Sequence, residues 1–419
     1  MGMTMRERKP YYREVAKRYQ KAGKKEKGVI LDEFVATVGL NRSYASTLLR
    51  NHGKVINTRR GIRLKGDITK GVKRRGRRKY YDDDVFQVIR KLWMVMDCIC
   101  GKRLKTVLDE VVENMINNNR LEIKQDVKIK LSGISASTID RMLVKERKKI
   151  SLKGRATTKP GTLLKNSIPI RTFAEWNEDK PGFTETDLVS HEGGNPRGDF
   201  AFSLNITDIN TGWVEPFCIK NKAAIWVKNA IDYIKNSLLP FDLLGIDTDS
   251  GSEFINQHLF KYCKDNQITF TRSRSYKKND NCYIEQKNYT VVRRAVGYYR
   301  YDSDLEVQII NELYENLRLY VNHFQPSMKL KEKIRIGSKV KKIYSLSQTP
   351  YRRVMESPHI LDEKKLKLKK IHDSLDVYLL KKNITNCQKK LLQIQKQKMN
   401  LGEVSTDDFQ VDFNYEATI

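Results

Sequence analysis

The first clear hydrophobic pattern along the chain is helical and lies in residues 29–52. An apolar-periodic helix reaches Gly39, and a second helix begins near Asn41 or Arg42. Helix, glycine turn and helix in this order are typical of a helix-turn-helix unit, and an ordinary helical hairpin shares the pattern. The side chains expected to face its core are Leu31, Phe34, Val35, Val38, Tyr44, Ala45, Leu48 and Leu49.

A second helical region covers residues 81–150. It begins with acidic residues at 82–84, which the helix dipole favours, and a further helix is expected at about 103–118. A second helix-turn-helix candidate follows, with its turn at Gly133 and Ser135 as the N-cap. We therefore expect two all-α units in the first 150 residues.

From residue 183 the apolar positions alternate as in strands. The order of elements is βββαβαβα, which predicts an α/β domain with a mixed sheet and flanking helices. The expected elements are strands at 183–191, 242–254 and 268–273, a hairpin at 199–219 turned at 210–212, and helices at 221–238, 256–266 and about 281–300. After this domain, a lysine-rich stretch at 329–342 precedes a helical run at 362–398.

Composition narrows the class of protein. The 419 residues carry 80 Lys+Arg against 50 Asp+Glu, a net charge of +30 that argues for a polyanionic partner. The sequence has no apolar run long enough to span a membrane, and its six cysteines are too scattered for a disulfide framework. We also expect no secretory leader. We expect a cytoplasmic nucleic-acid-binding protein and no membrane partner.

The charge is distributed unevenly along the chain. Residues 1–80 contain 24 basic and 6 acidic residues, whereas residues 176–325 contain 17 basic and 21 acidic residues. An acidic segment inside a basic chain fits a nucleic-acid-binding enzyme whose carboxylates hold metal ions. The expected parts are a helix-turn-helix unit at 1–58, a basic linker at 59–80, a second DNA-binding unit at 81–150, a linker at 151–175, a catalytic domain at 176–325, a mainly helical basic region at 326–400 and a disordered acidic tail at 401–419.

Three acidic residues occupy strand ends or helix starts in the acidic segment. Asp187 lies near the end of its first strand, Asp249 where a buried strand meets Ser250-Gly251, and Glu285 in the first turns of a helix. The fold would bring these three carboxylates together. Asp247 is an alternative to Asp249, since it lies two residues earlier on the same face. We expect Asp208 to have a surface role in the hairpin and His191 to lie at the surface or next to the site residues, with a catalytic role of His191 left open.

The segments TETDLVSHEGG, DTDSGSEFIN and FTRSRSYKKNDNCYIEQKN resemble the catalytic core of retroviral integrases and bacterial insertion-sequence transposases. The hallmark of that superfamily is Asp, Asp, 35 residues, Glu on a ribonuclease H-like fold, and 35 residues separate Asp249 from Glu285. The resemblance covers about 180–325. It implies that Asp187, Asp249 and Glu285 are catalytic residues and ligands of two Mg²⁺ or Mn²⁺ ions, with Asp187 bridging both.

Carboxylates suit these hard cations, and two such ions can stabilise the attacking and leaving oxygens of a phosphodiester. Zinc is not expected, because the six histidines are dispersed and no CxxC or HxxxH occurs. The chain also departs from the family pattern: Ser275 replaces a common proline, and Tyr289 replaces a common lysine.

The residues expected to contact DNA lie in four places. They are the face of the helix after Gly39, the arginine-rich centre of the linker, the loop before Glu285 and the helix that carries Glu285. The named residues are Arg42, Ser46, Arg50, Arg74, Arg75, Arg77, Arg78, Lys277, Lys278, Lys287, Asn288 and Arg293.

The leading hypothesis is a transposase of the bacterial cytosol that binds the double-stranded ends of its own element and joins them to target DNA. By analogy it acts as a homodimer or larger assembly on DNA. One alternative is an inactive or domesticated relative that only binds DNA. Another is a ribonuclease H-type nuclease acting on hybrids, which the helix-turn-helix candidates disfavour.

Overall fold

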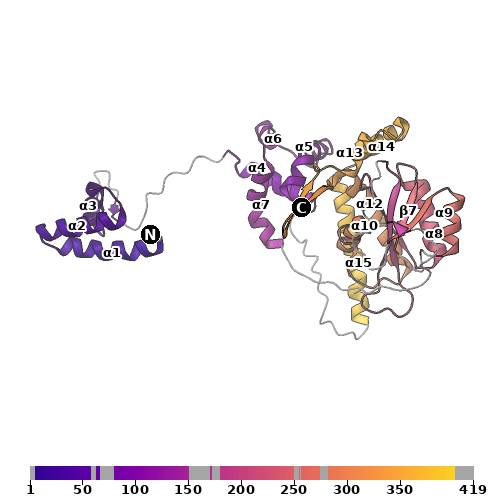
Figure 1. Ribbon diagram of the computed structural model, residues 1–419, viewed down its shortest axis with the longest axis horizontal. Helices are drawn as coiled ribbons and strands as arrows, with labels where there is room; N and C mark the ends of the chain where they lie inside the picture. The colour runs from indigo at the N-terminus through magenta and orange to yellow at the C-terminus, as the bar shows by residue number, and fades with distance from the viewer. Residues whose placement is uncertain are drawn as a thin grey trace. The chain divides into compact units, whose positions relative to one another are not determined.

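The computed structural model describes residues 5–57, 63–66, 80–150, 170–171, 180–249, 254, 256–273 and 282–401 (Figure 1). The chain divides into two compact units, Met1–Tyr80 and Tyr81–Ile419. Within the described residues, no helix has both the length and the apolar character that crossing a membrane requires.

The first unit is a small helical core with a two-stranded hairpin. Its elements are α1 (Met5–Lys21), α2 (Lys24–Val38), α3 (Arg42–Asn51), β1 (Val55–Asn57) and β2 (Arg63–Lys65). Gly39 ends α2 in the left-handed conformation, with φ of 72°. The Asn41 side chain caps α3 by accepting a hydrogen bond from the Ser43 amide at 3.0 Å. Helix α2 therefore ends, and α3 begins, where the sequence predicts, whereas α1 was not predicted.

Two details of this unit differ from expectation. Tyr44 is 53% exposed and does not join the core, because the inward stripe of α3 consists of Ala45 and Leu49. Strand β2 lies inside the stretch expected to be a linker and pairs with β1 in antiparallel register. The arginines at 74–78 lie outside the described residues.

The second unit is built on a mixed sheet, as predicted. Its strand order is β3-β8-β7-β4-β5-β6. Strands β3, β8, β7 and β4 run parallel to one another. Strand β5 pairs antiparallel with β4, and β6 pairs antiparallel with β5. The bounds are β3 (Ile170–Arg171), β4 (Phe183–Ser190), β5 (Phe202–Asp208), β6 (Val214–Ile219), β7 (Gly245–Thr248) and β8 (Thr269–Ser273).

Helices cover both faces of this sheet (Figure 1). On one face, α8 (Ala224–Tyr233), the π-helical turn η2 (Ile234–Leu238) and α9 (Gln257–Asp265) share a core with Leu204 and Ile206 of β5. The alternate residues of β5 face the other helices, and the Ser203 hydroxyl lies 2.6 Å from the Tyr314 hydroxyl. The elements on that second face are α10 (Cys282–Lys287), η3 (Asn288–Arg293), α11 (Arg294–Val296) and α12 (Asp304–Phe324).

A further helical layer packs on α12. It contains α4 (Asp83–Val95), α5 (Gly101–Asn117), α6 (Gln125–Ser132), α7 (Ala136–Ile150) and the C-terminal α15 (Val377–Leu401). Ile89 of α4, Leu313 of α12 and Leu391 of α15 belong to a single hydrophobic core. Residues 81–150 and 176–325 were expected to form separate domains, and this shared core contradicts that expectation. Most of the 151–175 linker lies outside the described residues.

The C-terminal region is less helical than expected. Its lysine-rich stretch forms a hairpin of β9 (Leu330–Ile336) and β10 (Lys339–Tyr344), followed by α13 (Pro350–Glu356) and α14 (Asp362–Ser374). The helical run predicted at 362–398 breaks before α15, where the Asp376 carboxylate accepts a hydrogen bond from the Tyr378 amide at 2.9 Å. The acidic tail from 402 onward lies outside the described residues.

Candidate active site

Four acidic residues lie on one face of two adjacent parallel strands. Glu185 of β4 pairs with Asp247 of β7, and Thr186 pairs with Thr248. Asp187 directly follows Thr186, and Asp249 directly follows Thr248, so the backbones of the two aspartates are neighbours. Because side chains alternate along a strand, Glu185 and Asp187 share a face, as do Asp247 and Asp249. The sheet thus gathers the predicted Asp187 and Asp249 at one place.

Hydrogen bonds fix the orientation of the Asp187 carboxylate. Its Oδ1 accepts from the Leu188 amide at 2.8 Å, and its Oδ2 accepts from the Asn288 side chain at 2.6 Å. The Asn205 amide in turn donates to Asn288 Oδ1 at 2.9 Å. Asn205 lies opposite Asp187 on β5, so β4, β5 and η3 are joined by one chain of side-chain contacts.

Glu185 connects the strand to the helix that carries Glu285. This buried carboxylate accepts a hydrogen bond from the Ile284 amide through its Oε2, at 2.7 Å. Ile284 immediately precedes Glu285 on α10, so the bond holds the Glu285 backbone to the same face of the sheet. The Glu285 side chain is outside the described set. Sequence analysis did not single out Glu185, although its place two residues before Asp187 on an alternating strand was a usable signal.

Asp247 and Asp249 occupy different environments. Asp247 is buried, and its Oδ1 accepts a hydrogen bond from the Thr271 hydroxyl of β8. Asp249 lies just past the end of β7 and is half-buried. A buried carboxylate bonded to a neighbouring strand supports the sheet, whereas one at the strand end can reach a ligand. The choice of Asp249 over Asp247 as the residue that contacts metal or substrate stays a prediction.

The charge of this face favours a cation. Like-charged carboxylates on one face repel one another, and a divalent ion or protons relieve that repulsion. Among the described side chains, no three His, Cys, Asp or Glu residues form a group that could hold a metal ion. Two of the three expected donors, Asp187 and Asp249, are among the described residues, whereas the side chain of the third, Glu285, is not, so metal binding at this face stays a prediction.

The basic residues predicted near this site have mixed surroundings. Lys287 is half-buried. Burial lowers its pKa to about 7, and the positive charges of Arg353, Arg103 and Lys329 act in the same direction. Arg293 donates to the Gly297 carbonyl at 3.3 Å and lies 4.7 Å from the centre of the Tyr298 ring. Asn288 is engaged with Asp187, as described above. Lys277 and Lys278 lie outside the described residues.

On the N-terminal unit, the predicted recognition face is largely exposed. Arg50 is exposed, and Ser46 is half-buried with its hydroxyl 3.2 Å from that of Tyr19. Arg42 is also exposed but forms an ion pair with Asp32. DNA contact by these three residues stays a prediction.

Two polar residues expected at the surface are buried. His191 bonds to the Ser203 hydroxyl at 2.7 Å, and burial lowers its pKa to about 3. Asp208 accepts hydrogen bonds from the amides of Gly182 and Thr211, at 2.8 and 2.6 Å, and so locks the β5–β6 turn. Their burial was not predicted, because the polar character of a residue does not reveal the strand pairing that encloses it.

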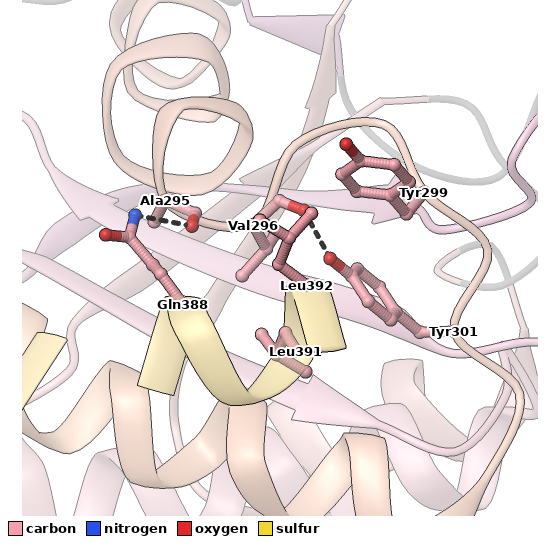
Figure 2. Close-up of a pocket in the computed structure, with 7 residues that line it drawn as sticks. All are labelled: Ala295, Val296, Tyr299, Tyr301, Gln388, Leu391 and Leu392. Atoms are coloured by element: carbon pink, nitrogen blue, oxygen red, sulfur yellow. Dashed lines mark hydrogen bonds between the residues drawn. The ribbon is translucent and has the colours of Figure 1, made fainter. Parts of the chain in front are cut away.

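A small cavity lies where α15 packs on α11, at Ala295, Val296, Tyr299, Tyr301, Gln388, Leu391 and Leu392 (Figure 2). Figure 2 shows Gln388 donating to the Ala295 carbonyl and the Tyr301 hydroxyl donating to the Val296 carbonyl, at 2.8 and 2.6 Å. Its volume of about 10 Å³ is close to the smallest that admits one water molecule. We assign it no ligand.

The fold and the acidic face define an α/β protein with a carboxylate-rich site on a mixed sheet. No family model matches the chain. The uncharacterized protein y4rM of Sinorhizobium fredii (strain NBRC 101917 / NGR234) is 35% identical over 332 residues, which is 79% of this chain and 90% of that protein. The chain belongs to the same family as y4rM.

Solved structures with a local likeness include two retroviral integrase cores. The catalytic core domain of BIV integrase aligns with a TM-score of 0.28 and 18% identity, covering 42% of this chain and 95% of that one. The HTLV-2 integrase catalytic core domain in complex with magnesium aligns with a TM-score of 0.26 and 16% identity, covering 35% of this chain and 90% of that one.

Proposed function

We propose that the chain is a DNA transposase that cleaves the ends of its own mobile element and joins their 3′ ends to target DNA. The observation that carries the proposal is the acidic face of β4 and β7. There Asp187 and Asp249 lie at equivalent positions of adjacent parallel strands, and the Glu185–Ile284 bond holds α10 beside them. This arrangement supports the site implied by the Asp, Asp, 35 residues, Glu resemblance.

In this proposal Asp187, Asp249 and Glu285 hold two Mg²⁺ or Mn²⁺ ions. Bound divalent ions would stabilise the attacking and leaving oxygens of the phosphodiester. The protein's own groups do the positioning. Asn288, oriented by Asn205, fixes the Asp187 carboxylate, while Glu185 fixes the helix that carries Glu285.

DNA recognition is assigned to the basic first unit. It holds much of the excess positive charge and exposes Arg50 on a capped helix that follows a glycine turn. Such a helix fits the major groove, and phosphate contacts would come from the basic segment after β2. Two element ends must be brought together, so the active form is proposed to be at least a dimer.

The test uses the full chain and a duplex carrying the inverted repeats that flank its gene. Cleavage and joining should require Mg²⁺ or Mn²⁺ and stop in EDTA. Asp187→Asn, Asp249→Asn and Glu285→Gln should each abolish both steps and leave end binding intact. Asp362→Asn, at an exposed carboxylate on α14, is the matched control and should keep wild-type activity.

Three results would count against the proposal. Cleavage that persists in EDTA would show that the reaction does not need a divalent metal ion. Robust joining by Asp249→Asn together with loss in Asp247→Asn would show that the wrong aspartate was chosen. End binding without any cleavage by the wild-type chain would favour the alternative of a DNA-binding protein without catalytic activity.

A further inference from the structure

Strands β9 and β10 form a two-stranded ribbon that is separate from the main sheet. They pair with each other from Leu330 to Tyr344 through a turn at Gly337-Ser338, where Gly337 has a φ of 59°. Every described side chain of β10 except the half-buried Ile343 is exposed. A ribbon that buries so little against its own chain has surface available for a partner.

The ribbon is strongly basic. Residues 330–344 contain six basic residues and one acidic residue. Among the described side chains, Arg335, Lys339, Lys341 and Lys342 are exposed and belong to none of the ion pairs that the described residues form. This charge is thus uncompensated within the described parts of the chain, and it favours a polyanion.

The cations point to both faces of the ribbon. Lys339 lies opposite Ile336 and Lys341 opposite Ile334, whereas Lys342 lies opposite Lys333 on the other face. Residues directly opposite in an antiparallel pair project to the same side, and successive residues project to opposite sides. A flat anionic surface would contact one face only. An element lying between two rows of phosphates would use both.

The base of the ribbon is anchored to the unit that carries the acidic face. Lys329 and Ser345 exchange hydrogen bonds of 2.9 and 2.7 Å where the two strands meet the body of the protein. Arg353 of α13 joins this base to the β5–β6 turn, by donating to the Ser327 hydroxyl at 3.0 Å and to the Thr211 carbonyl at 2.9 Å. Whatever the ribbon binds is therefore held at a fixed place relative to the sheet.

We propose that the β9–β10 ribbon enters the major groove of duplex DNA and places its lysines against the phosphates on both sides. The major groove of B-form DNA admits a two-stranded ribbon. Ile336, at the tip, is 70% exposed and can make the apolar contact that a thymine methyl group offers. The choice of DNA as the partner rests on the proposed function, whereas the metal chemistry of that function is not needed for this inference.

The experiment compares two triple variants of the full chain on a random duplex of about 30 base pairs. The ribbon variant is Lys339→Gln/Lys341→Gln/Lys342→Gln. The control, Lys367→Gln/Lys369→Gln/Lys370→Gln, removes the same charge from α14, where Lys367 and Lys369 are paired with Glu363 and Asp373. Affinity is measured over a range of salt concentrations.

The ribbon variant should bind about tenfold to a hundredfold more weakly, and the slope of log K against log salt should fall by about 2 to 3. The control should change affinity less than about threefold, because two of its three lysines, Lys367 and Lys369, already have carboxylate partners. The melting temperature should be unchanged in both, since the substituted side chains are exposed. Ile336→Ser, which alters no charge, should weaken duplex binding without changing the salt slope.

Several outcomes would overturn the proposal. One is equal binding by the ribbon variant and the control. Another is an equal loss on double-stranded RNA, whose deep and narrow major groove excludes the ribbon. Ribbon-dependent binding to phosphatidylserine vesicles without a change on DNA would assign the surface to a membrane instead.

The outcome for the ribbon can be separated from that for the proposed function. If the wild-type chain cleaves element ends but the ribbon variant binds like the control, only the ribbon proposal fails. If the ribbon variant loses affinity while no metal-dependent cleavage occurs in the wild type, the ribbon proposal stands and the transposase proposal fails. A wild-type chain that does not bind duplex DNA overturns both.

Discussion

At the residue scale, the state of Asp187 depends on the amide of Asn288, which donates to its carboxylate at 2.6 Å. A hydrogen bond to a charged group contributes about 1.5 to 3 kcal/mol, and about 1.4 kcal/mol corresponds to a tenfold change in rate. Asn288→Leu should therefore slow cleavage by about tenfold to a hundredfold, because the Asp187 carboxylate loses the donor that orients it.

Asn205→Ala should slow cleavage by a smaller factor, because it only frees the Asn288 amide to rotate. The measurement is the single-turnover cleavage rate of the three proteins. An unchanged rate in Asn288→Leu would show that this contact does not position Asp187 for the reaction.

A second residue-scale prediction concerns acid stability. Burial lowers the pKa of both His191 and His323 to about 3, from an unfolded value of 6.5. Between these values the unfolded chain binds protons that the native chain does not, so stability falls as the pH drops below 6.5. Each histidine should remove about 1.4 kcal/mol per pH unit in that window.

Urea unfolding at pH 7 and pH 5 tests this prediction on the wild type and on His191→Gln. The variant should be less stable at pH 7 and should lose less on acidification, by about 2 kcal/mol. His258→Gln, at an exposed position, is the control and should leave the pH dependence unchanged. Identical pH dependence in wild type and His191→Gln would contradict the assignment.

The sequence allowed only part of this site to be predicted. Asp187 and Asp249 could be proposed because strand alternation and the family resemblance both point to them, and the structure brings their backbones together. Glu185 and Asn205 could not, since their roles depend on the Ile284 amide and the Asn288 side chain, which lie far away in the sequence. Such partners become visible only once the strands and helices are paired.

At the scale of elements, a long-range hydrogen bond between Glu185 and the Ile284 amide holds α10 to the sheet. Glu185→Leu leaves that buried amide without its acceptor, which costs about 1 to 3 kcal/mol. Hydrogen exchange at Ile284 should become about tenfold to a hundredfold faster, and cleavage should fall with it. Glu185→Gln keeps an acceptor oxygen and should behave nearly like the wild type. Slow exchange in Glu185→Leu would contradict this role of Glu185.

Periodicity predicted strands β4 to β8 and many of the helices, because each has a clear apolar stripe or alternation. It failed where backbone details decide the element. The helix after Glu285 passes into the π-helical η3, and the run at 362–398 breaks at Asp376, whose carboxylate caps α15. The lysine-rich ribbon has little apolar alternation, since both of its faces meet solvent, so its strands gave no signal.

At the scale of the whole molecule, residues 81–401 should unfold as one unit. Helices α4, α5 and α15 share a hydrophobic core with α12. A fragment of residues 176–325 lacks these helices and would expose Ile310, Leu313 and Leu317, which are buried in the full chain. We expect that fragment to aggregate or to melt without cooperativity, whereas fragments 1–80 and 81–401 fold independently.

Thermal unfolding by circular dichroism and calorimetry of the three fragments tests this division. A cooperative transition in 176–325, at the temperature seen for 81–401, would restore the modular arrangement expected from the sequence. That expectation failed because a stretch with Pro and Gly, such as 151–175, does not reveal whether the segments it joins share a core.

The central claim is that Asp187 and Asp249 hold catalytic divalent ions. The most direct test is a Mn²⁺ titration of the full chain, followed by electron paramagnetic resonance of the free ion. The wild type and the Asp362→Asn control should bind up to two ions, and Asp187→Asn and Asp249→Asn should each bind at least about tenfold more weakly. No Mn²⁺ binding by the wild type, or equal affinity in Asp249→Asn, would contradict the account.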